Sequence, residues 1–133
     1  MLAPMSPLDE RQAALLREDG PARYRHWLSR CAGSGMIWGL RDGEGWALVG
    51  DEEGKVHFPV WPDADFAALC AVDDWSDHEP GSITLAEWLS AWLPNLAEQG
   101  WGVAVFPGPE GQGVHVTSDE LRADLEDEMT RQP

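Results

Sequence analysis

Basic residues are scarce in this chain. Of its 133 residues, nine are Lys or Arg and 24 are Asp or Glu, which gives a formal net charge of −15 at pH 7. Nucleic acids and anionic membrane surfaces attract clustered Lys and Arg, so we expect neither as a partner. The composition instead favours a basic protein as partner, or a surface whose charge only maintains solubility.

The shortage of basic residues is uneven along the chain. Residues 1–50 contain six Arg and six acidic residues, so they are neutral as a group. Residues 51–133 contain three basic residues, Lys55, Arg122 and Arg131, against eighteen acidic ones, and they carry the whole net charge. We therefore expect any charged binding face to come from residues 51–133.

Cysteine and long apolar runs are also lacking. The two cysteines, Cys31 and Cys70, fall in predicted helices without a closely spaced partner, so we expect reduced structural thiols. Residues 1–7 have neither the basic start nor the apolar stretch of a signal peptide, and no run is long enough to span a bilayer. We expect a cytoplasmic protein in which residues 1–7 are flexible.

The chain has the length and apolar content of one compact domain, since 43% of its residues are hydrophobic. The order of predicted elements is ααβββααββα, which indicates a single α+β domain over residues 1–133. We expect a mostly antiparallel sheet of about five strands, made of a three-strand meander and a C-terminal hairpin. The predicted strands are 36–41, 46–49 and 56–60 in the meander, and 101–106 and 114–117 in the hairpin.

Proline and capping residues set the expected ends of these elements. Pro59 cannot donate a ladder hydrogen bond, so its strand should lie at an edge or carry a bulge. Asp63 and Ser118 are expected to cap helices, and Thr84 to form a capping box with Glu87. Pro94 predicts a kink or a break in the helix that follows Thr84. The segment 73–81 has no periodicity and is predicted to be a loop.

Eight tryptophans are the most unusual feature of the composition. Most fall on apolar faces of predicted elements, where core packing explains them. Trp61 and Trp75 are the exceptions, because Trp61 lies at a turn and Trp75 in the polar loop. Exposed together, they would form a recognition patch beside the acidic loop; a structural role for both is the alternative. The candidate partner-binding residues are Trp61, Asp73, Asp74, Trp75, Asp77, His78 and Glu79.

Signals for catalysis, metals or cofactors are weak. His26, His57, His78 and His115 follow no metal-ligand spacing, so we predict no metal and no cofactor. No nucleophile elbow is present, and the glycine-rich segment 108–113 has no Lys for a phosphate. We therefore predict no catalytic residues. An enzyme remains the alternative if His57, His78 and His115 converge with Asp77 and Glu79, since His57 and His115 lie on strands that could approach.

Several ordered motifs resemble a known family. They are Ile-Trp-Gly-Leu at 37–40 with Gly-Trp-Ala-Leu at 45–48, Phe-Pro-Val-Trp-Pro at 58–62, Trp-Leu-x-x-Trp-Leu-Pro at 88–94, and Val-Phe-Pro at 105–107. Over residues 20–130 the chain looks like the bacterial family catalogued as domain of unknown function 2750. That family has no established activity, so the resemblance implies no site residue. The pattern of elements is also similar to the enhanced-serine-sensitivity (SseB) family, which implies an interaction module.

Three functions follow from these patterns. We favour a small acidic interaction or regulatory module that binds a basic protein, because the acidic residues are segregated. A self-associating, homo-oligomeric subunit is the second hypothesis, since eight tryptophans are many for one small core. An enzyme with a site assembled from distant histidines is the third.

Overall fold

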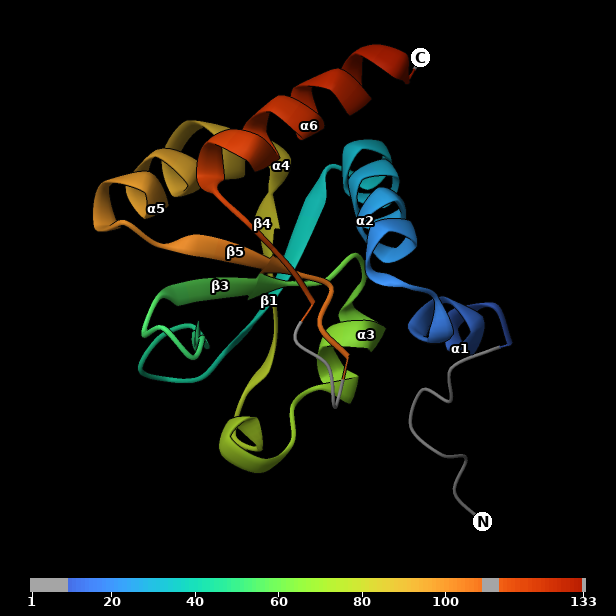
Figure 1. The fold of residues 1–133 in the computed structure, drawn as a ribbon. Helices are drawn as coiled ribbons and strands as arrows, with labels where there is room; N and C mark the ends of the chain where they lie inside the picture. The colour runs from blue at the N-terminus through green and yellow to red at the C-terminus, as the bar shows by residue number, and fades with distance from the viewer. Residues whose placement is uncertain (1–9, 109–112, 133) are drawn as a thin grey trace.

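The computed structural model describes residues 10–108 and 113–132. The predicted flexible segment 1–7 and most of the 107–113 loop therefore lie outside the described residues. The fold is α+β, as predicted, with helices around a two-stranded and a four-stranded sheet (Figure 1). In chain order the elements are α1 Glu10–Arg17, α2 Gly20–Ser34, β1 Met36–Arg41, β2 Val49–Gly50, β3 Val56–Val60, α3 Ala64–Leu69, the 3₁₀ turn η1 Asp73–Trp75, β4 Glu79–Thr84, α4 Leu85–Glu87, the π-helical turn η2 Trp88–Trp92, α5 Leu93–Gln99, β5 Gly102–Val105, β6 Val114–Val116 and α6 Ser118–Arg131.

The larger sheet has the strand order β2-β3-β5-β6. Its pairs are antiparallel except for β3 and β5, which run parallel. The smaller sheet pairs β1 with β4 antiparallel, and a bridge between Trp38 and Trp61 connects it to the end of β3. In the view of Figure 1, α5 and α6 lie above β3 and β5, whereas α3 lies below them.

The predicted three-strand meander is wrong in its pairing. Residues 42–45 form the expected turn, in which the Asp42 N–H donates to the Gly45 carbonyl oxygen at 2.8 Å. Beyond it, however, the chain keeps only a single bridge from Trp46 to Arg41 and leaves the ladder. The long partner of β1 is β4, in a segment predicted to be a loop up to Gly81.

Two residues concealed β4 in the sequence. Pro80 and Gly81 both disfavour strands, but β4 pairs only with β1 and is an edge strand, where Pro is tolerated. Gly81 is required by close packing, because a Cβ there would lie 2.7 Å from Cδ of Arg41 and 2.9 Å from the ring of Trp46. The glycine therefore marks the approach of two side chains and not the end of a strand.

The prediction that the strand with Pro59 lies at an edge is wrong for β3 as a whole. At Pro59 itself, however, the strand is paired on one side only. β3 lies between β2 and β5. The two residues of β2 pair only with Val56 and His57, so at Pro59 the ladder has a partner on one side, Ala104 of β5. A missing N–H is tolerated in such a position.

Of the expected helix caps, those at Thr84 and Asp63 are confirmed in position, whereas the one at Ser118 is wrong. The Thr84 hydroxyl accepts the N–H of Glu87 at 3.1 Å, which is one of the two hydrogen bonds of the predicted capping box. Asp63 occupies the N-cap position of α3 without a capping hydrogen bond, because its carboxylate pairs with Arg30. The cap of α6 is Thr117, in a capping box with Glu120, and not Ser118.

The predicted break at Pro94 does not occur, because a π-helical turn precedes the proline. The N–H of Leu93 donates to the carbonyl oxygen of Trp88, five residues back, and α5 continues from there. A π turn widens the helix locally and accommodates a residue that cannot donate to the ladder. The chain is therefore wound from Leu85 to Gln99 without a break.

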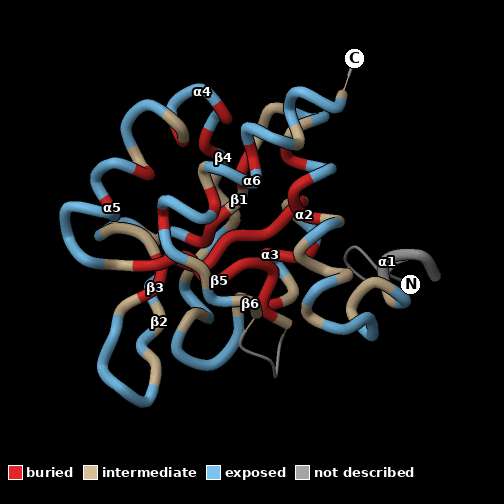
Figure 2. The backbone as a smooth tube through the Cα atoms, turned by 45° about the horizontal axis from the view of Figure 1, so that its top comes forward, coloured by how far each residue is buried: buried red, intermediate tan, exposed pale blue. Residues whose placement is uncertain are grey.

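The core accounts for the tryptophans. Trp27, Trp61 and Trp88 have no exposed surface, and the other five, 38, 46, 75, 92 and 101, are partly buried against the same cluster. Buried segments concentrate on the central strands and on the inner sides of the helices around them (Figure 2). Cys31 and Cys70 are buried and unpaired. Within the described residues, no helix is both long and apolar enough to cross a membrane.

Candidate functional site

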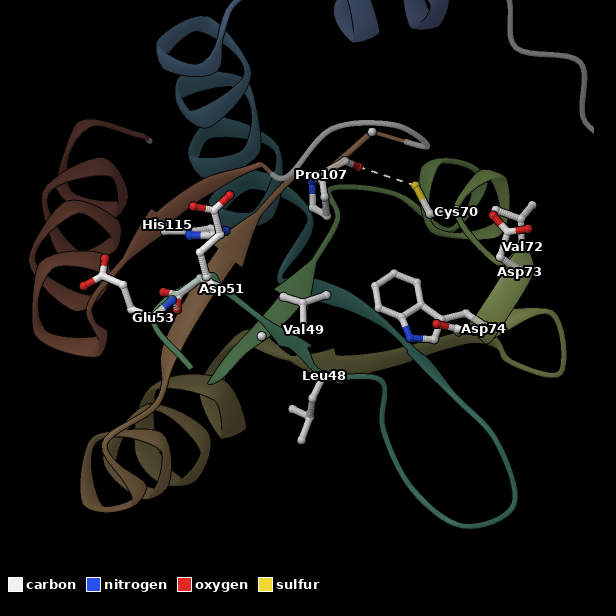
Figure 3. A pocket seen from close by; sticks show the side chains of 14 residues that line it. Leu48, Val49, Asp51, Glu53, Cys70, Val72, Asp73, Asp74, Pro107 and His115 are labelled. Carbon is white, nitrogen blue, oxygen red and sulfur yellow. Dashed lines mark hydrogen bonds between the residues drawn. The ribbon is translucent and has the colours of Figure 1, made fainter. Parts of the chain in front are cut away.

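A pocket of about 690 Å³ lies between the segments 48–53 and 70–75 (Figure 3). Figure 3 shows Asp51, Glu53 and His115 on one side of it and Val72, Asp73 and Asp74 on the other. The lining residues are Leu48, Val49, Gly50, Asp51, Glu52, Glu53, Cys70, Val72, Asp73, Asp74, Trp75, Pro107, Gly108 and His115. The pocket is therefore assembled from stretches of the chain that are far apart in the sequence.

The lining combines apolar surface with carboxylates. Cys70 and Pro107 are buried, and the Cys70 thiol contacts the Pro107 carbonyl oxygen at 3.4 Å. Leu48 and Val72 are unusually exposed for their type, at 40% and 45%. Five carboxylates surround this apolar surface, and no Lys or Arg is among the described lining residues. The electrostatic potential in the pocket is therefore negative.

The acidic residues 73 and 74 are held in place by a 3₁₀ turn. The Trp75 N–H donates to the Val72 carbonyl oxygen at 2.9 Å, and the Trp75 ring packs edge-on against buried Trp61 at 6.2 Å between centroids. Asp73 has a left-handed backbone with φ of 53°, a conformation that Asp adopts more readily than most residues. These contacts fix the direction in which the segment enters the pocket.

The opposite wall is a turn organised by Asp51. Its Oδ1 accepts the N–H groups of Glu53 and Lys55, each at 2.9 Å, and Gly54 supplies the left-handed residue with φ of 84°. This turn joins β2 to β3, as the sequence predicted. Asp51 Oδ2 lies 3.0 Å from His57 Nε2. The hydrogen bond with His57, followed by those from the backbone, lowers the pKa of Asp51 below its usual value.

His57 and His115, whose approach the sequence leaves open, meet beside this turn. Their rings stack with centroids 4.1 Å apart and planes at 24°. His57 is only 4% exposed, whereas His115 is exposed and lines the pocket. Gly102 makes room for the His57 ring, because a Cβ there would lie 2.7 Å from its Nδ1. Ligand atoms of Asp51, His57 and His115 all lie within 4.8 Å of one another.

The structure separates the residues that the sequence grouped as one partner-binding surface. Asp73, Asp74 and Trp75 line the pocket. Trp61 is completely buried and donates from Nε1 to the Pro107 carbonyl oxygen at 2.8 Å, so it forms no surface patch with Trp75.

The remaining candidates lie away from the pocket lining. His78 Nε2 is 3.7 Å from Asp42 Oδ2, and Glu79 is paired in the ladder with Arg41. Asp77, at the end of the 73–78 turn, is exposed and does not line the pocket. The cluster of His57, His78 and His115 considered for an enzyme is therefore not assembled, because His78 lies beside Asp42 instead.

The 48–53 side of the pocket was not among the predicted site residues. The run Asp51-Glu52-Glu53 lies between two predicted strands, where the sequence indicates only a turn. Three consecutive acids before a strand were a usable charge signal. Their approach to residues 72–75 depends on where the sheet places two distant loops, which no local pattern contains.

Comparisons with known proteins give one result. Neither the search of curated proteins nor the search of solved structures finds a significant match. The likeness to the SseB family stays a prediction. A family model described as "Protein of unknown function (DUF2750)" matches residues 24–125, which is most of the chain and includes both β sheets. The chain therefore belongs to the DUF2750 family.

Proposed function

We propose that this protein is a small interaction module that binds a basic partner protein by receiving Lys or Arg side chains in the acidic pocket. The observation that carries the proposal is the convergence of five carboxylates from two distant loops on one pocket. Residues 51–133 hold the whole net charge, and the pocket lies on residues from that part together with Leu48, Val49 and Gly50.

Four of the five pocket carboxylates differ from most acids of α6 in their pairing. Glu52, Glu53, Asp73 and Asp74 have no side-chain hydrogen bond or ion pair with any described residue. Several acids on α6, by contrast, have partners: Glu126 lies 3.8 Å from Arg122, and Asp127 pairs with Arg131. Unpaired like charges around one cavity repel each other, and a bound cation relieves that repulsion. The pocket is therefore the better cation-binding surface.

The apolar part of the lining suits the same ligand. Lys and Arg have long apolar stems below their charged groups, and such stems cover apolar surface while the charge stays near carboxylates. Val72 and the ring of Trp75 provide that surface, and an aromatic ring also attracts a cation. A cavity of about 690 Å³ is within the range of roughly 300–1,000 Å³ that is typical of binding pockets.

The observations that favoured self-association or catalysis do not hold in the structure. Self-association was suggested by the number of tryptophans, but every one of the eight packs in or against the core. Catalysis was suggested by three histidines, of which only two meet. We also propose a cytoplasmic location, since Cys31 and Cys70 are unpaired and such thiols persist in a reducing compartment.

Fluorescence anisotropy with labelled Lys-Ala and Arg-Ala peptides tests the proposal. The pocket variant combines Glu52→Gln, Glu53→Gln, Asp73→Asn and Asp74→Asn, where Asn keeps the left-handed conformation at 73. The control variant removes the same charge elsewhere, at exposed positions: Glu44→Gln, Asp77→Asn, Glu79→Gln and Glu98→Gln. We expect the pocket variant to bind at least about tenfold more weakly, a difference of about 1.4 kcal/mol, and the control to bind nearly as the wild type does.

The salt dependence is a second readout. Binding that depends on several charge contacts weakens as salt rises, and the pocket variant should show a smaller dependence than the control. Equal loss of affinity in both variants would mean that the peptides sense the total charge of the protein. In that case the acidic character maintains solubility, and the proposed function is wrong.

A further inference from the structure

We propose that Asp51, His57 and His115 form a binding site for a divalent transition-metal ion such as Zn²⁺, with an open coordination position toward the pocket. This inference does not depend on the proposed binding of a basic partner. It rests on Asp51 and His57, which lie on either side of one turn, and on His115, which the fold brings to them from a distant part of the sequence.

The donor set selects the class of metal. Two imidazoles and one carboxylate are ligands that zinc and its first-row neighbours prefer. Calcium and magnesium take oxygen ligands almost exclusively, so the histidines disfavour them. Three protein ligands also leave one tetrahedral position for water or an exogenous donor, as in zinc sites that bind substrates.

The distances are compatible with one ion. Donor atoms that bind one zinc at about 2.0–2.2 Å in a tetrahedron lie roughly 3.3 Å from each other. His57 Nε2 and Asp51 Oδ2 are already 3.0 Å apart, and all three donors lie within 4.8 Å of one another. His115 must move most, and it is the exposed member of the set, on the short strand β6. Binding therefore requires the His115 ring to leave its stacked position on His57 and turn toward the ion.

The other two ligands are held in advance. His57 is 4% exposed and lies on β3, between β2 and β5, with Gly102 against its ring. Asp51 uses Oδ1 to accept two backbone N–H groups and directs Oδ2 at His57. Hydrogen bonds of this kind to a ligating carboxylate are the usual support around metal ligands. The two oxygens of Asp51 thus have separate tasks, one structural and one available to a metal.

The position of the cluster connects it to the pocket. Asp51 and His115 both line the cavity, whereas His57 lies behind them and is buried. An ion bound by all three would therefore have its open coordination position on the cavity side. The surrounding carboxylates Glu52, Glu53, Asp73 and Asp74 raise the local concentration of cations and would favour metal entry.

Titration of the metal-free protein with Co²⁺ tests the site, because tetrahedral cobalt absorbs visible light and reports its own coordination. We expect saturation at one ion per chain, displacement of cobalt by Zn²⁺, and a rise in the melting temperature with Zn²⁺. The variants His115→Ala and Asp51→Asn should bind at least about tenfold more weakly, since even residues that only support metal ligands often cost that much. Asp51→Asn keeps an oxygen for the two backbone N–H groups, so the turn should remain folded.

His78→Ala is the matched control, because it removes a histidine that lies beside Asp42 and outside the cluster. It should bind Co²⁺ as the wild type does. The inference is overturned if cobalt gives no tetrahedral absorption, or if His115→Ala and His78→Ala bind alike. It is also overturned if only the four-carboxylate pocket variant loses cobalt, because the acids alone would then hold the ion. Peptide binding measured with EDTA present keeps this outcome separate from the proposed function.

Discussion

Cys70 lies at the inner end of the pocket and shows how burial controls the chemistry of one residue. Its thiol contacts the Pro107 carbonyl oxygen at 3.4 Å, and the residue is 4% exposed. Burial raises the pKa of Cys70 to about 11, although Trp61 and Arg23 act in the opposite direction. Burial also raises the pKa of Cys31, which has no exposed surface. Because the thiolate is the reactive form, neither residue should be a nucleophile near neutral pH.

Labelling with a thiol reagent checks this at the residue scale. In the native protein near pH 7 we expect almost no modification of either cysteine, and full modification of both in urea. The single variants Cys31→Ala and Cys70→Ala assign each signal. Reactivity should rise only as the pH approaches the raised pKa values, because the charged form is disfavoured below them. Rapid labelling of native Cys70 would show that the reagent reaches this thiol, which contradicts its burial in the structure.

Local sequence patterns predict some residues of the site, but they do not predict whether each residue is exposed or buried in the fold. The polarity of the segment around Trp75 predicts Asp73 and Asp74 as partner-binding residues, and both line the pocket. The same reasoning grouped Trp61 with them, although Trp61 is completely buried. An apolar residue at a turn is exposed or buried according to what packs over it. That information lies in the contact with Pro107, 46 residues further along the chain.

At the scale of elements, the start of α6 offers a direct test of the capping geometry. The hydroxyl of Thr117 accepts the N–H of Glu120 at 3.1 Å, and the Glu120 carboxylate accepts the N–H of Thr117 at 2.9 Å. Ser118, the residue expected to cap from the sequence, has instead a buried hydroxyl with no partner among the described residues. Adjacent hydroxyls should therefore differ in their contribution to stability.

Urea denaturation of alanine variants measures that difference. Thr117→Ala should lower the free energy of unfolding by about 1 kcal/mol, within the usual range of 0.5–2 for an N-cap. Thr117→Ser, which keeps the hydroxyl, should lose much less. Ser118→Ala should change the free energy of unfolding little or raise it, because it removes a buried polar atom without a partner. A larger loss at Ser118 than at Thr117 would mean that the cap was assigned to the wrong residue.

Elements with local signals were predicted from the sequence, and those that depend on distant partners were not. Helix α2 begins after Asp19 with Pro21 and ends at Gly35 in the left-handed conformation, as its pattern indicates. The pairing of β5 with β6 also follows from a local hairpin pattern. The pairing of β1 with β4 and the parallel pairing of β3 with β5 join segments separated by about 40 residues. Local propensity contains no information on such partners, and Pro80 with Gly81 even argued against β4.

At the scale of the whole molecule, the acidic half of the sequence contains two groups of clustered carboxylates. One is the pocket, whose carboxylates at 52, 53, 73 and 74 have no side-chain partner among the described residues. The other is α6, where Asp124 accepts a hydrogen bond from Tyr24 at 2.6 Å and Glu120 belongs to the capping box. A carboxylate that is already hydrogen-bonded or ion-paired within the fold attracts a basic partner less strongly than an unpaired carboxylate does. We therefore expect a basic partner to bind at the pocket and not along α6.

Amide NMR during titration with a Lys- and Arg-rich peptide distinguishes these surfaces most directly. We expect the largest shifts at residues 51–53 and 73–75 and at the Trp75 indole N–H, and we expect these shifts to disappear at high salt. Shifts centred on residues 119–128 of α6, or spread evenly over the acidic surface, would contradict the claim that the pocket is the binding site.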